Sequence, residues 1–205
     1  LEVCERVLRE AYARLGYRIS VEHLPAQRSL YWADTGRLDG DLCRAQSYAS
    51  LIKVPTPILH WQLTAFSTRP LDIHSWDDLK PFKVGYERGM TLIAQHTELT
   101  LLPANSIESA ILQASKGRVD VLLNDDFTTR YNLRRMGIDN LIANPTPLAP
   151  GPAFHLLNSK HQKLAEQLNA VLMDMDSSGR IRQIKDDVID AYMRKAEQEY
   201  RQARD

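Results

Sequence analysis

The sequence lacks the features that mark several specialised classes of protein. Lys+Arg and Asp+Glu are both 26 among 205 residues, so the formal net charge is zero. A nucleic-acid-binding domain normally carries a basic excess or stripe, and neither is visible here. The longest apolar runs, such as residues 119–123, which Asp120 interrupts, are far too short for the roughly 20 residues of a membrane-spanning helix. We therefore expect neither nucleic-acid binding nor direct membrane insertion.

Cysteine is also scarce, with only Cys4 and Cys43. Their spacing matches no metal or redox motif. A disulfide in an oxidising compartment is one possibility, but we favour two buried free thiols, because free cysteine is among the most buried residue types. The six histidines do not cluster, so we expect no metal site and no cofactor. The chain begins at Leu1 without a leader-like segment, which indicates that a leader was removed or the chain was trimmed.

What the sequence does contain is the composition of an ordinary globular protein, with 43% apolar and 25% charged residues. Apolar spacing predicts helices and strands that alternate along the chain. Helices are expected at 2–15, 28–35, 90–96, 105–116, 126–136, 161–175, 179–184 and 186–204. Strands or extended segments are expected at 17–24, 38–45, 53–59, 61–67, 82–86, 99–102, 119–124, 140–147 and 153–157. This order predicts an α/β fold with mostly parallel sheets covered by helices on both faces.

Two helix starts carry capping signals. Ser75 with Asp78, and Asn105 with Glu108, each place a capping residue three positions before an acid. The unit from 82 to 145 repeats strand and helix without interruption, and Pro-containing extended segments flank it. We interpret these segments as two hinge crossings. The first lobe would then be 1–66 with 148–205, and the second, inserted lobe 67–147; a single continuous sheet is the alternative.

Enzyme motifs are missing. The sequence holds no G-x-S-x-G elbow, no P-loop and no G-x-G-x-x-G. We therefore expect a protein that binds and does not catalyse. Some proteins of related fold are dehydratases or carry lyase modules, and the candidate base under that alternative is Asp125, which nothing marks as catalytic.

Several stretches together resemble the type 2 periplasmic binding protein family, the extracellular solute-binding proteins of amino-acid-type ABC transporters. The stretches are Thr35–Asp41 (TGRLDGD), Trp76–Leu79 (WDDL) followed by Val84–Thr91 (VGYERGMT), and Gly117–Asp125 (GRVDVLLND) with Tyr131 beyond it. The resemblance covers most of the chain and implies a two-lobed type II fold. It also implies a first strand before the first helix, which this sequence lacks. The segment 39–44 departs from the family pattern, which indicates a divergent branch.

The resemblance suggests Arg44 as the residue that holds a ligand carboxylate. Arg44 follows a predicted strand, and ligands of open α/β sheets bind outside the carboxyl ends of strands. Its guanidinium offers a planar fork of donors that matches a carboxylate. Arg28, at the start of a predicted helix, is a second candidate, although a solvent-exposed or structural role is at least as compatible with its position.

A second set of candidates lies in the inserted lobe. Arg88, Met90 and Thr91 sit between a strand and a helix, where free backbone N–H groups favour an anion. The family binds a ligand carboxylate at the matching turn, whereas ordinary capping is the structural alternative. Asp125 matches a family position that often accepts a ligand ammonium group. Its neighbour Asp126 is available to cap the next helix. The sequence leaves open which of these two acids caps the helix and which one contacts a ligand.

These expectations combine into one function. The chain would be a periplasmic or extracytoplasmic monomer that captures an amino acid, a similar zwitterion or a carboxylate, and delivers it to a membrane permease. The alternatives are a ligand-sensing domain of a membrane signalling protein, working with a receptor partner, and a binder that recognises a protein. Trp32, Trp61 and Tyr86 could contact a ligand, but aromatic residues at such spacings are more often core.

Overall fold

The computed structural model describes residues 2–24, 26–45, 48 and 50–203, and within these ranges all side chains except those of residues 26, 27, 91 and 150. The chain divides into two compact units. The first unit comprises Leu1–His60 and Gly151–Ile189, and the second comprises Trp61–Pro150 and Asp190–Asp205. This division differs from the expected one mainly at residues 190–205, which belong with the second unit.

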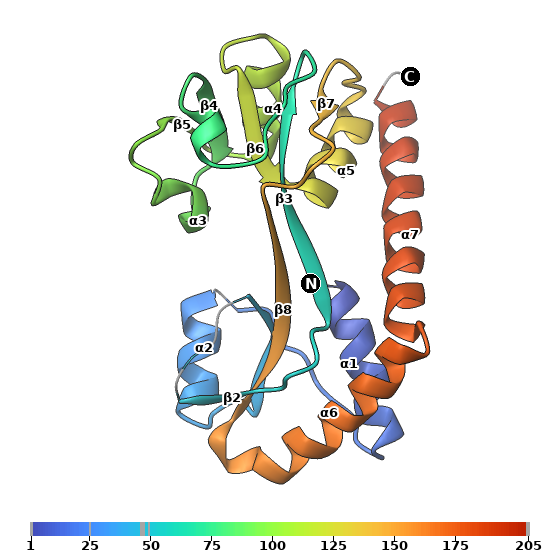
Figure 1. The fold of residues 1–205 in the computed structure, drawn as a ribbon. Helices are drawn as coiled ribbons and strands as arrows, with labels where there is room; N and C mark the ends of the chain where they lie inside the picture. Colours follow the sequence, from blue (N-terminus) through green and yellow to red (C-terminus); the bar gives the residue numbers. More distant parts are fainter. Residues whose placement is uncertain (1, 25, 46–47, 49, 204–205) are drawn as a thin grey trace. The chain divides into compact units, whose positions relative to one another are not determined.

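Among the described residues, the first unit contains two short strands, most of a third, and five helices or helix segments. Figure 1 shows how they are connected. These are α1 (Glu2–Arg14), α2 (Ala26–Asp34), β1 (Gly40–Arg44), β2 (Leu51–Lys53), most of β8 (Ala149–Asn158), the short helix η2 (Ser159–His161), α6 (Gln162–Ser177) and the start of α7 (Arg180–Gln202). Both β1 and β2 pair antiparallel with β8, with Gly40 opposite Leu157. The expectation of mostly parallel sheets is therefore wrong for the described part of this unit.

The second unit holds a mixed sheet. Its elements are most of β3 (Leu59–Ser67), η1 (Asp77–Leu79), β4 (Lys83–Glu87), α3 (Thr91–Ala94), β5 (Thr100–Ala104), α4 (Ile107–Ser115), β6 (Val121–Asp125), α5 (Asp126–Met136), β7 (Ile142–Ala143) and the end of α7. β4 pairs in parallel with both β5 and β6. β3 pairs antiparallel with β6 and with β7.

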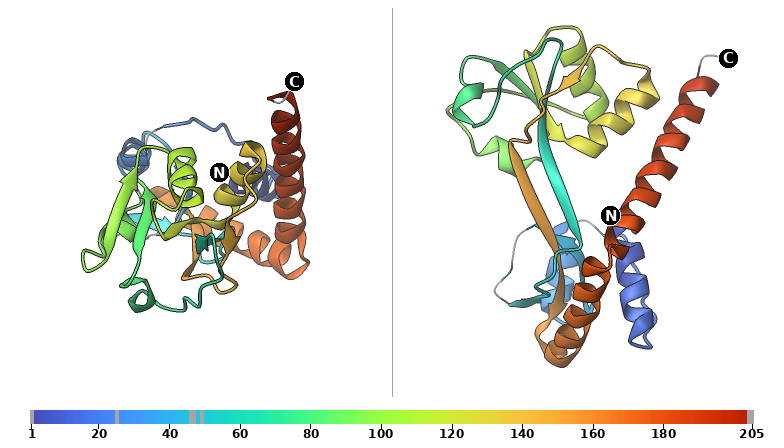
Figure 2. Two further views of the ribbon diagram at one scale, coloured as in Figure 1. Left: turned by 90° about the horizontal axis from the view of Figure 1, so that it is seen from above. Right: turned by 45° about the vertical axis from the view of Figure 1, so that its right-hand side comes forward.

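Apolar side chains cover both faces of this sheet. Along β6, Val121 and Leu123 belong to one buried cluster, and Leu122 between them belongs to another that includes residues of α4. Alternate residues of a strand point to opposite faces, so a strand buried on both sides reads as a continuous apolar run. The apolar run of β6 is therefore explained by its place inside the second unit. Figure 2 shows the same elements from two further directions.

Helix ends account for several differences from the sequence-based expectations. The cap of α4 is Ser106, whose side chain accepts from the Ser109 N–H, and not Asn105. Asp78 accepts from the backbone of His74 and Ser75, so this acid organises the turn before η1 without starting a longer helix. The expected break at residue 185 is absent, because α7 runs unbroken from Arg180 to Gln202.

The largest difference concerns residues 17–24, which form no strand in the structure. Tyr17, Ile19 and Val21 alternate with polar residues as a strand would require. The segment has no paired strand beside it in the described chain, and alternation without a partner cannot produce a sheet.

No described helix combines the length and apolar character needed to cross a membrane.

Candidate functional site

A pocket of about 780 Å³ lies within the first unit. Pockets that hold small molecules typically measure roughly 300–1,000 Å³. Residues 17–24 form one wall and residues 37–42 with Arg44 form another, while Tyr12 of α1 and His155 of β8 also contribute. The pocket thus follows the edge of β1 that does not pair with β8.

Asp41 is the buried polar centre of this pocket. Its side chain is only 4% exposed. The carboxylate accepts hydrogen bonds from the Ser29 hydroxyl at 2.6 Å and from the Arg44 guanidinium at 2.7 Å. A buried carboxylate is stable only when it is paired and hydrogen-bonded, and here Arg44 supplies the opposite charge.

Arg44 is the last residue of β1 and lines the pocket, and part of its charge is offset by Asp41. Its contact with a ligand carboxylate stays a prediction. Its Nε is buried and has no hydrogen-bond partner among the described residues. A buried N–H without an acceptor costs about 1–3 kcal/mol.

His155 and Tyr12 form a second buried pair beside Asp41. His155 Nδ1 lies 2.7 Å from the Asp41 carbonyl oxygen, which can only accept, so Nδ1 carries the proton. Nε2 then accepts from the Tyr12 hydroxyl at 2.9 Å. Burial lowers the pKa of His155 to about 4 and raises the pKa of the Tyr12 hydroxyl. The pair is neutral at pH 7 and fixes the middle of β1.

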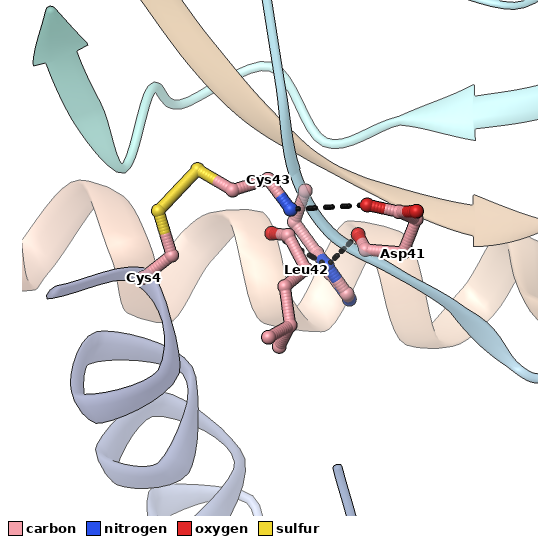
Figure 3. Close-up of a disulfide and its surroundings, with 5 residues drawn as sticks. Cys4, Asp41, Leu42 and Cys43 are labelled. Atoms are coloured by element: carbon pink, nitrogen blue, oxygen red, sulfur yellow. Dashed lines mark hydrogen bonds between the residues drawn. A yellow bond between two sulfur atoms is a disulfide. The ribbon is translucent and has the colours of Figure 1, made fainter. Parts of the chain in front are cut away.

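A disulfide joins Cys4, at the start of α1, to Cys43, near the end of β1 (Figure 3). The expectation of two free thiols is therefore wrong. Residues 39 apart in sequence come together because α1 packs against β1. The Cys43 N–H also donates to the Asp41 carboxylate, so the disulfide and the polar centre share one strand.

Asp39 and His161 mark the other end of β1. His161 Nε2 lies 2.7 Å from the Asp39 carboxylate, and Lys160 approaches the same group at 3.2 Å. The hydrogen bond from His161 is the main cause that lowers the pKa of Asp39. Charged groups therefore occur at both ends of β1, with the neutral His155–Tyr12 pair between them.

Arg28 is exposed on α2 and does not line the pocket, although its neighbour Ser29 does. Trp61 and Tyr86 pack with the apolar core of the second unit, as the structural alternative predicted. Trp32 carries the Arg37 guanidinium 3.6 Å above its ring. The described residues contain no group of three or more acidic, histidine or cysteine side chains arranged to hold a metal ion.

In the second unit, the candidate turn from Arg88 to Thr91 connects β4 to α3. The Arg88 N–H donates to the Ala104 carbonyl at 2.8 Å, and Gly89 adopts φ +103°, which favours glycine. Met90 packs against the apolar core, and the Arg88 side chain is exposed. α3 is only four residues long, and the Thr91 side chain lies outside the described residues.

Asp125 caps α5. Its Oδ1 accepts from the Thr128 N–H at 2.8 Å and from the Thr128 hydroxyl at 2.7 Å. The capping role that the sequence left open between two acids therefore belongs to Asp125, while Asp126 pairs with Arg130. Both hydrogen bonds use one oxygen, so the structure leaves room for the predicted interaction with a ligand and does not test it.

The sequence did not single out Asp41, Ser29, Tyr12 or His155. Asp41 belongs to the TGRLDGD stretch that resembles a family turn, and the other three residues carry no local signal. These residues come together because β8 and α1 pack against β1. The spacing of residues along the chain does not predict these contacts. The aspartate three residues before Arg44 was the one available signal of an ion pair.

The comparison with known proteins supports the fold. No established family profile matches the chain. An uncharacterized protein of Shewanella oneidensis is 28% identical over 195 residues, which cover 88% of this chain and 74% of that protein. Among solved structures, the GluR0 ligand-binding core in complex with L-glutamate matches with a TM-score of 0.73 and 16% identity, over 93% of this chain and 89% of that one.

Two further structures match over most of both chains. A histidine kinase sensor domain with similarity to periplasmic binding proteins has a TM-score of 0.69 and 16% identity, covering 90% of this chain and 84% of its own. The amino acid ABC transporter substrate-binding protein AbpA of Streptococcus pneumoniae, bound to L-arginine, has a TM-score of 0.68 and 13% identity, covering 93% and 84%. The fold is that of the type II periplasmic binding proteins.

Proposed function

We propose that this chain is an extracytoplasmic binding protein for a small polar ligand, an amino acid or a similar zwitterion or carboxylate. The observation that carries the proposal is the type II fold, shared with structures that hold L-glutamate and L-arginine. A fold hosts several functions, so the chemistry of the candidate residues must support the choice.

The proposed ligand contacts are Arg44, with Arg28, in the first unit and Arg88, Met90, Thr91 and Asp125 in the second. Arg44 brings a guanidinium that lines the pocket of the first unit and is 25% exposed. Asp125 brings a carboxylate of which one oxygen is used for capping. Arg44 would suit an anionic ligand group, and Asp125 would suit a cationic one. The two predicted lobes would correspond to the two units.

The disulfide supports an extracytoplasmic location. Disulfides persist in the periplasm and outside the cell, whereas cytosolic thiols are kept reduced. Cys4 and Cys43 are almost fully buried, with 1% and 9% exposure, which is typical of a structural disulfide and not of a catalytic one. In this compartment the protein would deliver its ligand to a membrane permease.

A second candidate function is ligand sensing for a membrane signalling protein. The likeness to a histidine kinase sensor domain favours it, since that structure shares the fold to a similar extent. Ligand binding is common to both candidates. Pull-down of a permease or of a signalling receptor from solubilised membranes, with ligand present, separates them.

The test of the proposal is a thermal-shift screen of the purified protein against amino acids, small carboxylates and polyamines. A ligand present at about 100 times its dissociation constant adds about 2.7 kcal/mol of stability. We expect a clear rise in Tm with one class of amino acid or carboxylate. The absence of any shift, in folded protein freed of bound ligand by unfolding and refolding with the disulfide intact, would contradict the proposal.

A further inference from the structure

One helix belongs to both units of the protein. α7 runs unbroken from Arg180 to Gln202, and the boundary between the units falls inside it, between Ile189 and Asp190. The strands β3 and β8 also begin in one unit and end in the other. The chain therefore passes between the units in two strands and again in α7. Any relative movement of the units must either bend this helix or detach one of its ends.

The first part of α7 is held by the first unit. Ile181, Ile184 and Val188 are buried and recur at intervals of three and four residues, which places them on one face of the helix. The Arg180 guanidinium donates to the Glu10 carboxylate of α1 at 2.9 Å. The beginning of α7 is therefore attached to the first unit by an apolar stripe and by an ion pair.

The second part of α7 is held by α5 of the second unit. The Tyr192 ring packs edge-to-face on Phe127 and on Tyr131, with ring centroids 5.8 Å and 5.7 Å apart. Such T-shaped pairs stabilise a contact beyond the apolar area that they bury. Further along, the Tyr200 ring lies so close to Gly137 that a β-carbon at this position would collide with it. The end of α7 is therefore docked on α5 over several turns.

Between its two docked parts, α7 passes through residues poorly suited to a helix. Residues 186–190 read Asp-Asp-Val-Ile-Asp, and all five rank below Ala, Leu, Lys and Glu as helix formers. Asp190 lies four residues after Asp186 and three after Asp187, and like charges at these spacings destabilise a helix. All three carboxylates are exposed and lie beyond the first turn, where the helix dipole would have favoured them. Arginines four positions before and after this segment offset part of the repulsion. α7 is therefore weakest at the boundary between the units.

We propose that residues 186–190 are a hinge in α7, which bends there while both of its ends stay docked. A hinge is a short segment that absorbs a change of backbone dihedral angles while the parts on either side move as rigid bodies. Bending of this segment and movement of the units are then one equilibrium. A change that favours helix at 186–190 therefore favours one arrangement of the units. This goes beyond the binding function proposed above and requires no ligand.

The distance between two spin labels measures the bend. The labels replace Gln183 and Gln198, which are exposed and neutral and lie in the first and in the second part of α7. Azide-bearing amino acids introduced at these positions carry the labels, so the native disulfide stays intact. This length of straight α-helix separates the two Cα atoms by about 22 Å, and a bend shortens the distance. Double electron–electron resonance therefore reports the ratio of bent to straight α7.

Substitutions at exposed positions change this ratio without touching the core. The triple variant Asp186→Ala, Asp187→Ala, Asp190→Ala raises helix propensity and removes the repulsion, so its ratio of bent to straight α7 should be about tenfold below that of the wild type. Asp187→Gly should have a ratio about fivefold above that of Asp187→Ala, because the two differ only in helix propensity. Lys195→Gly and Lys195→Ala are the matched control pair in the docked part, and they should have the same ratio.

Three results would overturn the proposal. The same distance distribution in the wild type and in every variant at 186–190 would show that α7 does not bend there. A difference between Gly and Ala at Lys195 as large as that at Asp187 would show that the helix yields along its whole length. Loss of hydrogen-exchange protection at 192–200 in Asp187→Gly, relative to Asp187→Ala, would show that the end of α7 leaves α5 and that the helix does not stay docked.

Discussion

The two units assemble their sheets from strands at different distances along the chain. In the second unit β4, β5 and β6 follow one another in sequence and pair in parallel, with helices between them. In the first unit β1 and β2 pair with β8, which follows the whole sheet of the second unit in the chain. Local alternation of strand and helix therefore specifies the sheet of the second unit. The strands of the first unit depend on β8, which is distant from β1 and β2 in the sequence.

The units also differ in what stabilises them. The sheet of the second unit is covered by apolar clusters on both faces. The strand β1 of the first unit is fixed by a disulfide, the Asp41–Arg44 ion pair and the His155–Tyr12 pair. We therefore expect redox state and pH to act mainly on the first unit.

Removal of the disulfide gives the largest expected effect. A disulfide between residues 39 apart stabilises by about 4 kcal/mol, since it limits the freedom of the unfolded chain. The double variant Cys4→Ser, Cys43→Ser should lose about this much, measured by urea unfolding. Hydrogen exchange should show the loss in residues 40–44 far more than in 121–125. Equal loss in both regions would refute the contrast between the units.

Acid should destabilise the first unit through His155. The pKa of His155 is about 4 in the folded chain and about 6.5 in the unfolded chain, so protons bind the unfolded state more readily. Its effect is absent at neutral pH, grows as pH falls below about 6.5 and levels off below about 4. By pH 5 it should amount to about 2 kcal/mol.

The check is urea unfolding of the wild type and His155→Gln at pH 7 and pH 5. The variant is less stable at both values, but it should lose about 2 kcal/mol less than the wild type between them. His74→Gln, at an exposed position of the second unit, is the matched control and should keep the wild-type difference. An identical pH dependence in His155→Gln would show that burial of this histidine does not govern acid stability.

Much of the fold was predictable from the sequence because helices and the second sheet have local signals. β6 and α5 followed from an apolar run and from 3.6-residue periodicity, and Gly137 ends α5 at φ +64°. The strand predicted at 17–24 failed because pairing needs a neighbour that the pattern cannot supply. The disulfide was missed because two cysteines without a motif give no indication of which elements meet.

The candidate site was predictable only in part. Arg44 ends β1 and Asp125 precedes α5, and both positions can be predicted approximately from the sequence. The other partners of Asp41, to which Arg44 is paired, are not readable, because Ser29 and His155 reach this strand from α2 and β8. The predicted ligand contacts of Arg88, Met90 and Thr91 rest on the resemblance to the family, and they stay predictions.

The smallest expected effect separates capping from binding at Asp125. Asp125→Ala removes the cap of α5 and should cost about 1 kcal/mol, while Asp125→Asn keeps a good capping residue and should cost less than about 0.5 kcal/mol. Ser106→Ala, which removes the cap of α4, is the matched control for stability. If Asp125 binds a ligand cation, Asp125→Asn loses affinity although it remains stable. Retained affinity in Asp125→Asn would assign this residue to the helix alone.

Calorimetric titration of the ligand identified by the screen, into wild type and Arg44→Ala, tests the central claim most directly. We predict one-site binding to the wild type, and a loss of about 2–5 kcal/mol in Arg44→Ala if the ligand carboxylate is buried against this guanidinium. Circular dichroism and urea unfolding of the variant establish that it is folded, since Asp41 loses its partner. Undiminished affinity in folded Arg44→Ala, or no binding heat with the wild type, would contradict the account.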